Sequence, residues 1–162
     1  MYIFNEDGAA DIYQTPAVLE GKLVFVAYDG DFHSVYIHDP ATEETTPIAG
    51  EWSTPPVDPI HGAGRYALVG EMLYFAAYDD EYPTQTGTEL WKAPIDGVGN
   101  PQLVKDIRTG TNSSSPDNLT VVGGKLFFDA DYSSQEGRMY VCDLATDDIQ
   151  MIAAVPGYIV EP

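Results

Sequence analysis

Short apolar and aromatic runs, separated by turn residues, follow one another along most of the chain, and this pattern predicts β-strands. Residues 23–28 (LVFVAY) and 73–78 (LYFAAY) are rich in β-branched and aromatic side chains. Each run is too short between helix-breaking residues to form a helix. The chain has 15 Gly and 12 Pro, which interrupt it too often for long helices. We therefore expect an all-β fold of many short strands.

The apolar pattern repeats. Three segments align with one another, and Leu23, Leu73 and Leu126 correspond in them, at separations of 50 and 53 residues. The aligned segments are residues 17–29 (AVLEGKLVFVAYD), 67–79 (ALVGEMLYFAAYD) and 120–132 (TVVGGKLFFDADY). Each continues into a second shared piece in which Tyr36, Leu90 and Tyr140 correspond: residues 34–49 (SVYIHDPATEETTPIA), 88–107 (TELWKAPIDGVGNPQLVKDI) and 138–153 (RMYVCDLATDDIQMIA).

Each repeat is expected to be a four-stranded antiparallel meander. Its first two strands are joined at Glu20-Gly21, Gly70-Glu71 or Gly123-Gly124, where a two-residue hairpin needs positive backbone φ. A repeat of this length and make-up is typical of a β-propeller blade, and a blade needs neighbours to cover its faces. The sequence therefore predicts stacked propeller blades.

We expect one repeat domain over residues 1–162. Met1-Tyr2-Ile3 matches Met139-Tyr140-Val141, so residues 1–14 are expected to form a partial blade and residues 156–162 to begin another unit. Full blades are expected at residues 17–50, 66–107 and 118–155, with connectors at 51–65 and 108–117. Three blades and a part do not close a ring. The predicted partners are thus neighbouring blades of a longer chain, the favoured alternative, or further copies in a homo-oligomer.

The formal charge of −19 disfavours nucleic acid as a partner, because the chain would repel a phosphate backbone. The acidity suits a saline or calcium-bearing medium, although it also simply favours solubility. No apolar run approaches the length of about 18 residues that spans a membrane. Cys142 is the only cysteine and lies in an apolar run, which is typical of a buried thiol.

Residues 86–130 resemble the ELWxxDGT-type repeat of bacterial extracellular or surface-associated β-propeller-like proteins. The matching phrases are Glu89-Leu90-Trp91, Asp96-Gly97, Leu103-Val104-Lys105-Asp106-Ile107 and Asn118-Leu119-Thr120, while Val98 replaces the family's Thr and residues near Pro94-Ile95 are inserted. The resemblance implies a propeller fold and an extracellular or cell-surface location. It implies no reaction.

An acidic segment follows the second strand of each repeat, and we expect these segments to be exposed loops. Carboxylates at alternate loop positions suit calcium, although Asp and Gly are also ordinary turn residues. The candidate calcium ligands are Asp29, Asp31, Asp79, Asp80, Asp129 and Asp131, with Glu81 beside them.

Three aromatic residues, Phe32, Trp52 and Tyr82, are expected in loops, where they are candidates for binding a sugar or protein ligand. The alternative is a packing role. Aromatics in predicted strands are instead expected to fill the space between blades: Trp91, Tyr36, Tyr74 and Tyr140.

No catalytic motif is present. The three histidines lack the spacing of a metal site, and Ser113-Ser114-Ser115 reads as a solvated connector instead of a nucleophile. The sequence therefore predicts a non-catalytic binding or structural module of a secreted or surface-associated protein, acting in adhesion or in protein or glycan interaction. The alternative is an extracellular glycan-active enzyme with paired carboxylates.

Overall fold

A computed structural model describes residues 17–19, 21–28, 33–47, 57–59, 66–79, 86–95, 101–133 and 136–152. These residues form only β-strands and connecting turns, which confirms the predicted all-β fold. The strands are β1 (Ala17–Leu19), β2 (Lys22–Tyr28), β3 (His33–Asp39), β4 (Glu44–Pro47), β5 (Val57–Pro59), β6 (Tyr66–Val69), β7 (Met72–Asp79), β8 (Thr86–Pro94), β9 (Gln102–Lys105), β10 (Asp117–Val122), β11 (Lys125–Ser133), β12 (Glu136–Asp143) and β13 (Asp148–Met151).

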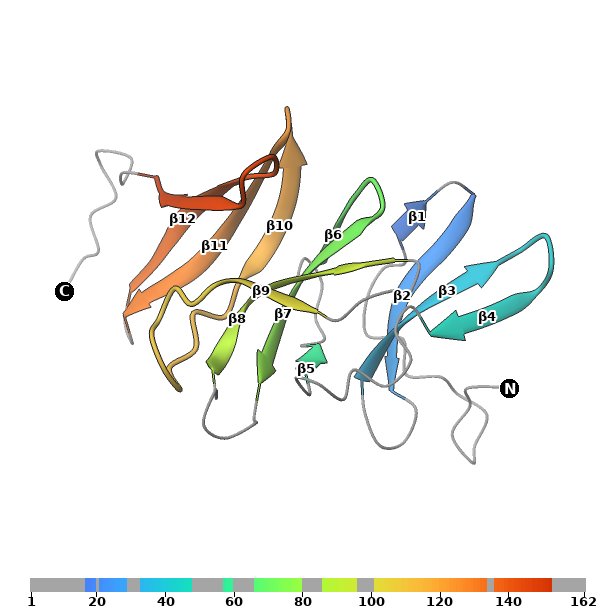
Figure 1. Ribbon diagram of the computed structural model, residues 1–162, viewed down its shortest axis with the longest axis horizontal. Coiled ribbons are helices and arrows are strands. Elements are labelled where there is room, and N and C mark those ends of the chain that lie inside the picture. The colour runs from blue at the N-terminus through green and yellow to red at the C-terminus, as the bar shows by residue number, and fades with distance from the viewer. Residues whose placement is uncertain are drawn as a thin grey trace.

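The strands form three antiparallel sheets that follow one another along the molecule (Figure 1). The first sheet has the order β1-β2-β3-β4 and the last sheet has the order β10-β11-β12-β13. The middle sheet has the order β5-β7-β8-β9, and β6 also pairs with β7. In the first and last sheets, and from β6 to β9 in the middle sheet, chain neighbours are sheet neighbours, so these are the meanders that the sequence predicts. Among the described residues, no helix is long and apolar enough to cross a membrane.

The inner hairpins form where glycine permits them. Two residues separate β1 from β2, β6 from β7 and β10 from β11. Gly21, Gly70, Gly123 and Gly124 have φ of 82°, 57°, 57° and 76°. This left-handed region is disfavoured for side chains other than those of Asn and Asp. The predicted hairpins are confirmed at all three sites.

The outer turn of the first and last sheets is built alike. The Asp39 carboxylate accepts a hydrogen bond from the Ala41 amide at 2.9 Å, and Asp143 accepts one from Ala145 at 3.0 Å. Lys22 lies 3.2 Å from Asp39 and Lys125 lies 3.3 Å from Asp143. The amide and then the lysine lower the pKa of each carboxyl group below its usual range.

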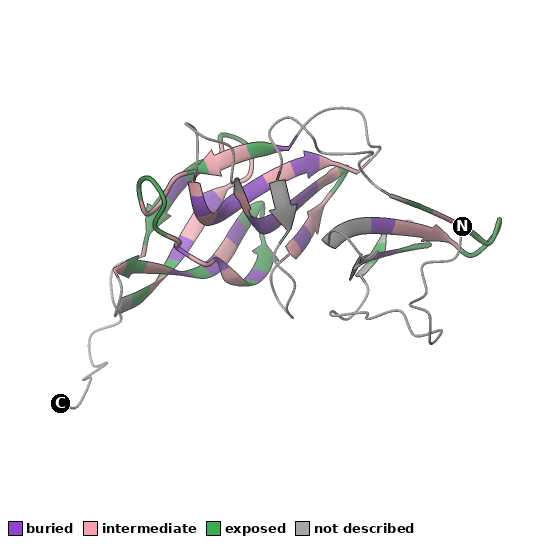
Figure 2. Cartoon of the chain, turned by 90° about the horizontal axis from the view of Figure 1, so that it is seen from below, coloured by how far each residue is buried: buried purple, intermediate pink, exposed green. Residues whose placement is uncertain are grey.

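The core lies between the sheets. Val24 of the first sheet packs against Leu73 and Trp91 of the middle sheet. Tyr74 and Leu90, on the opposite face of the middle sheet, pack against Phe128 of the last sheet. Figure 2 shows these buried positions as bands across the middle and last sheets. Each sheet hides a face of its neighbour, as expected of stacked blades.

Register confirms that the three leucines are equivalent. Leu23 pairs with Val18 and His38, Leu73 with Leu68 and Ala93, and Leu126 with Val121 and Cys142. Three of the four strand aromatics fill the space between sheets as predicted: Trp91 and Tyr74 are each 3% exposed and Tyr140 is 6% exposed. Tyr36 is also buried, at 7% exposed, but it lies on the face of the first sheet opposite to Val24 and stacks on Phe25.

One predicted correspondence is wrong. The phenylalanine two residues after each leucine pairs with Tyr36, Trp91 or Tyr140, so Trp91, and not Leu90, is the equivalent of the two tyrosines. A slip of one residue moves a side chain to the other face of a strand. Leu90 accordingly packs toward the last sheet and Trp91 toward the first.

A short strand also lies within the segment that was expected to be a connector. β5 pairs with the end of β7, through Val57 to Asp79 and Pro59 to Ala77, while β6 pairs with its beginning. In the last sheet, β10 alone covers the corresponding edge, with a register irregularity between Asp117 and Thr120. The expected partial units at residues 1–14 and 156–162 lie outside the described residues.

Candidate functional site

The structure contradicts the expectation that Asp129 and Asp131 lie in a loop. Both lie within β11, which continues to Ser133 and pairs with β12 as far as Glu136. Residues at i and i+2 of a strand share a face but stand about 7 Å apart, so the two carboxylates do not converge as they would around a loop glycine. Asp129 is exposed, and its carboxylate accepts a hydrogen bond from the side-chain Nδ2 of Asn118 at 3.0 Å.

The other predicted site residues are not placed by the structure. Asp79 ends β7, and its side chain is not described. Asp29, Asp31, Asp80, Phe32, Trp52 and Tyr82 lie outside the described residues. Within the described part of the chain, no group of three His, Cys, Asp or Glu residues could hold a metal ion. Calcium binding through the acidic segments stays a prediction.

A buried carboxylate that the sequence analysis missed lies at the end of the middle sheet. Glu89, on β8, is 0% exposed. Its Oε1 accepts from the amides of Ser114 at 3.1 Å and Arg108 at 3.3 Å. Its Oε2 accepts from the Ser114 hydroxyl at 2.6 Å and the Ile107 amide at 2.9 Å. Both oxygens are thus occupied by the segment that leads to the last sheet.

Neighbouring contacts hold the same segment, residues 107–116, against β8. The Ser113 hydroxyl accepts from the Thr88 backbone amide at 2.9 Å, and the Gly87 amide donates to the Gly110 carbonyl at 3.0 Å. Within the segment, Arg108 donates to the Ser113 carbonyl at 2.8 Å. Gly87 lets the backbone of β8 lie directly against the backbone of Asn112, because a Cβ at Gly87 would meet the Asn112 carbonyl oxygen at 2.2 Å. We call this arrangement of residues 87–89 and 107–114 the Glu89 lock.

The Glu89 lock corrects the interpretation of the serine run. Ser114 is 0% exposed, and was expected to be part of a solvated connector. Burial raises the pKa of Glu89 above its usual range, while the hydrogen bonds from Ser114, Ile107 and Arg108 oppose that rise. A fully enclosed carboxylate with four donors cannot reach a substrate, so its role is to position the connector.

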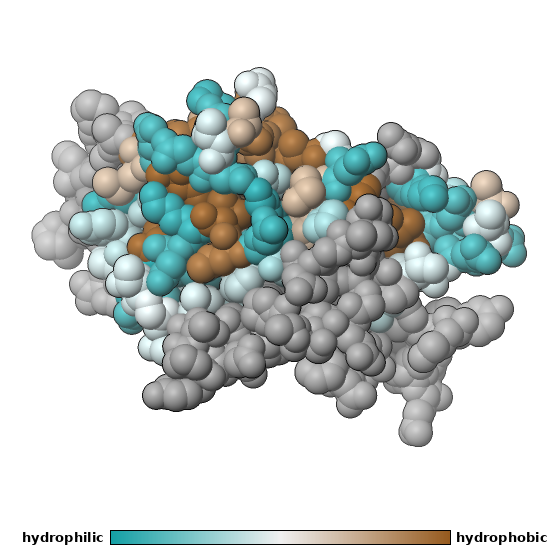
Figure 3. Space-filling view, in the orientation of Figure 1, coloured by the Kyte–Doolittle hydropathy of each residue, from teal (hydrophilic) through white to brown (hydrophobic). Residues whose placement is uncertain are grey.

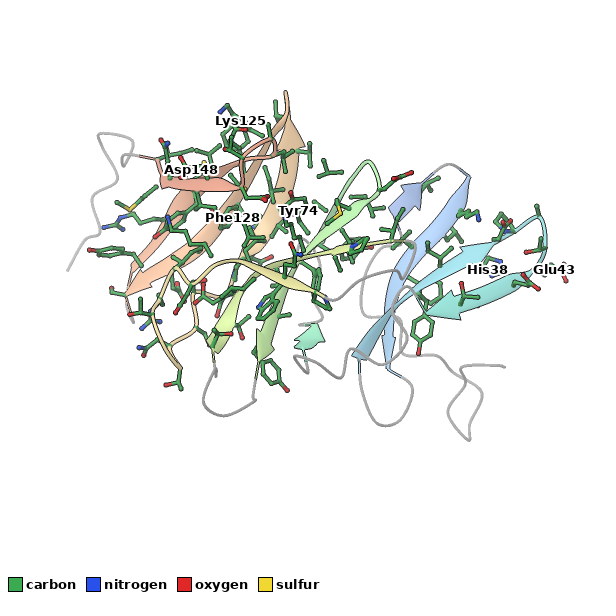
Figure 4. All side chains as sticks on the ribbon, in the orientation of Figure 1. His38, Glu43, Tyr74, Lys125, Phe128 and Asp148 are labelled. Atoms are coloured by element: carbon green, nitrogen blue, oxygen red, sulfur yellow. The ribbon has the colours of Figure 1, made fainter. Side chains whose placement is uncertain are left out.

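A polar contact joins the middle and last sheets on the other side of their shared core. Asp147, in the turn after β12, accepts a hydrogen bond from the Tyr74 hydroxyl at 3.0 Å and pairs with Lys92. Figure 4 shows Tyr74 and Phe128 in the region between the two sheets. Burial and the nearby carboxylate raise the pKa of Tyr74. We call Tyr74, Lys92 and Asp147 the inter-sheet triad.

The last sheet turns one face away from the middle sheet. Cross-strand pairs place Phe127 with Val141, and Asp129 with Met139, on that face. Met139 is 51% exposed and Val122, farther along it, is 58% exposed. We call it the open face, and its members are Thr120, Val122, Lys125, Phe127, Asp129, Met139, Val141 and Gln150. In Figure 3, apolar atoms also reach the surface on the side of the molecule that carries β10 to β12, framed by hydrophilic side chains.

Comparison with solved structures identifies the architecture. A puromycin hydrolase in complex with PGG aligns with 89% of this chain at a TM-score of 0.65 and 13% identity. A prolyl endopeptidase aligns with 85% of this chain at a TM-score of 0.59 and 14% identity. It is one of two such enzymes studied for the role of inter-domain dynamics in catalysis and specificity. TolB from Acinetobacter baumannii aligns with 91% of this chain at a TM-score of 0.52 and 16% identity. The three sheets are β-propeller blades.

The aligned chain corresponds to 20% of the length of the puromycin hydrolase, 19% of the prolyl endopeptidase and 30% of TolB. No family model and no curated protein matches it. The resemblance to ELWxxDGT-type repeats therefore stays a prediction, as does the extracellular location that it implies.

The comparisons contradict the function expected from the sequence. Two of the structures that align with most of the chain are a puromycin hydrolase and a prolyl endopeptidase, and neither is an adhesion or glycan-binding module. The expectation of a binding or structural module of a secreted or surface-associated protein, acting in adhesion or in protein or glycan interaction, is thus wrong. The alternative, a glycan-active enzyme with paired carboxylates, gains no support from them either.

Proposed function

We propose that this chain is a non-catalytic propeller portion of a peptide-hydrolysing protein. The observation that carries the proposal is the alignment of the whole row of blades with a puromycin hydrolase and a prolyl endopeptidase, of which it spans 20% and 19%. Four-fifths of each of those chains lies beyond the aligned part. The hydrolytic reaction is accordingly assigned to a part of the protein other than these blades.

The chemistry of the described blades supports the same division. Glu89 is the fully buried carboxylate among them, and all of its contacts go to the connector. Tyr74, Lys92 and Asp147 satisfy one another between two blades. These groups hold blades in place.

The experiment compares the 162-residue chain with the complete gene product on a panel of fluorogenic peptides that includes proline-containing ones. We expect hydrolysis by the complete product and none by the chain alone. A complete product that cleaves no peptide of the panel contradicts the proposal, and so does an active isolated chain.

A variant sharpens the assignment. Glu89→Gln in the complete product is expected to lower the melting temperature and to leave kcat unchanged at temperatures well below the melt, since Glu89 only positions the connector. A loss of kcat in a fully folded variant would place Glu89 in the reaction centre.

A further inference from the structure

The row contains two interfaces between blades, and polar groups fix one of them. Between the middle and last blades, Tyr74 donates to Asp147 at 3.0 Å and Lys92 pairs with the same carboxylate. Lys105 also donates to the Ile149 carbonyl at 2.9 Å. Hydrogen bonds have preferred directions, so these contacts set how the two blades lie against each other.

The first blade has hydrocarbon side chains at two of these positions. Val24 pairs with Ile37 in the first sheet as Tyr74 pairs with Lys92 in the middle sheet. A phenol and an ammonium group are thus replaced where the first blade faces the middle blade. The inter-sheet triad therefore has no counterpart at Val24 and Ile37, which follows from residue type and register alone.

Apolar contact holds the first blade to the middle blade. Val24 is 0% exposed and packs with Leu73 and Trp91. Ile37 packs against the same cluster. The Tyr66 hydroxyl lies 3.5 Å from the Val24 carbonyl, which is long for a hydrogen bond between two oxygens. Apolar attraction is non-directional, so it opposes exposure of the two surfaces but does not fix their relative position.

A buried donor at this interface lacks an acceptor. Trp91 is 3% exposed, and its Nε1 makes no hydrogen bond within the part of the chain that the structure describes. An N–H group that is removed from water without an acceptor costs free energy, and the cost disappears when water reaches the group. The closed contact thus carries a penalty at Trp91, whereas the Tyr74 hydroxyl at the other interface donates to a carboxylate.

We propose that the first blade shifts against the middle blade, while the middle and last blades move as one body. The shift opens a gap at Val24 and Trp91 without unfolding a blade, as when packed elements slide in a shear motion. Both interfaces lie inside the row, so the comparison does not depend on what precedes or follows these blades. It does not depend on the proposed function either, because the readout is chemical access to each interface and not hydrolysis.

Thiol labelling tests the proposal, because each interface can carry one cysteine. Cys142, the only cysteine of the chain, is 0% exposed and packs with Tyr74 and Leu90 between the middle and last blades. Val24→Cys combined with Cys142→Ala moves the thiol to the other interface. Urea denaturation shows whether both chains are folded, and labelling is then measured at urea concentrations below the unfolding transition.

We expect the introduced thiol to react at least about tenfold faster than Cys142. Its rate should hardly change with urea, because a shift of one blade exposes little surface. Equal rates for the two thiols overturn the proposal. A rate for the introduced thiol that rises with urea as steeply as global unfolding overturns it too.

Exchange of the Trp91 indole proton checks the same movement without altering the interface. The chain has two tryptophans, so Trp52→Phe assigns the two indole resonances. The Trp91 proton should exchange for deuterium at least about tenfold faster than global unfolding permits. Exchange at the rate of global unfolding overturns the proposal.

Tyr74→Phe is the matched variant for the other interface, because it removes one hydrogen bond between the middle and last blades. Labelling of Cys142 should become about fivefold faster, while the Trp91 indole proton exchanges at the wild-type rate. Equal acceleration at both reporters would mean that the two interfaces open together, and this result overturns the proposal.

Discussion

The two central strands of the middle blade pair in the same register as those of the last blade, yet the residues along them are buried to different extents. In β7, five consecutive residues from Leu73 to Ala77 are buried, whereas in β11 burial alternates, with Leu126, Phe128 and Ala130 buried and Asp129 exposed. A strand covered on both faces needs apolar residues throughout, and a strand covered on one face does not. Position in the row, more than the repeat itself, therefore sets which residues stabilise each blade.

The polar contacts follow the same rule. The Glu89 lock and the inter-sheet triad both involve β7 or β8 of the middle blade. The first and last blades have the exposed Lys22–Asp39 and Lys125–Asp143 pairs instead. Buried polar contacts that join blades are expected to matter more than ion pairs in exposed turns.

The largest difference should come from the leucines. Leu73→Ala is expected to lower the free energy of unfolding by about 3 kcal/mol, because it leaves a cavity between two blades. Leu23→Ala, at the equivalent but partly exposed position, should cost about 1 kcal/mol. Urea denaturation of both variants measures the difference. Equal losses would mean that the two blades are equally covered.

The Glu89 lock should come next. Glu89→Gln is expected to cost about 2 kcal/mol, because the amide cannot accept hydrogen bonds from all four donors. The pKa of Glu89 is raised in the folded state, so its carboxyl group stabilises the fold most below its unfolded pKa and loses that contribution as the pH rises through the folded pKa. The loss caused by Gln should therefore shrink as the pH rises above about 4.5. Denaturation at several pH values checks the sign, and a loss that grows with pH would contradict it.

The inter-sheet triad should have a smaller effect. Asp147→Asn is expected to cost about 1 kcal/mol through the contact with Lys92. Asn tolerates the φ of 58° at this position, so the backbone is preserved. Asp148→Asn is the control, since Asp148 is exposed and contacts Gln150 of its own strand. A double-mutant cycle of Asp147→Asn with Lys92→Met that shows no coupling would remove the triad from the account.

The smallest effect should come from a turn. Lys125 of the last blade corresponds to Met72 of the middle blade. Lys125→Met therefore gives the two blades the same residue at this position and removes the ion pair between Lys125 and Asp143. The free energy of unfolding should change by less than about 0.5 kcal/mol. A loss above about 1 kcal/mol would show that these repeated turns stabilise the blades after all.

The sequence predicts the features that depend on neighbouring residues. Hairpin glycines and apolar runs lie close together in the chain, so Gly21, Gly70 and Gly123 identify the turns and the strands around them. The equivalence of Leu23, Leu73 and Leu126 follows from the repeat alone.

The features that the sequence did not predict depend on distant contacts or on single-residue register. Glu89 and Ser114 are 25 positions apart, and polar residues at that distance leave no periodic signal. The sequence matches Leu90, and not Trp91, with the two tyrosines because an alignment of short apolar runs tolerates a slip of one residue, whereas a sheet does not. The sequence predicts a loop at Asp129 and Asp131 because they follow the apolar run of the second strand and Asp is a common turn residue, yet on an open strand face an Asp costs little.

Hydrogen exchange of the backbone amides, resolved to individual strands, tests the central claim most directly. If the middle blade is covered on both faces by its neighbours, the amides of β7 and β8 should exchange most slowly and only through global unfolding, while those of β4 and β13 exchange fastest. Amides of β7 that exchange as fast as those of β13 would contradict the stacked arrangement of the three blades.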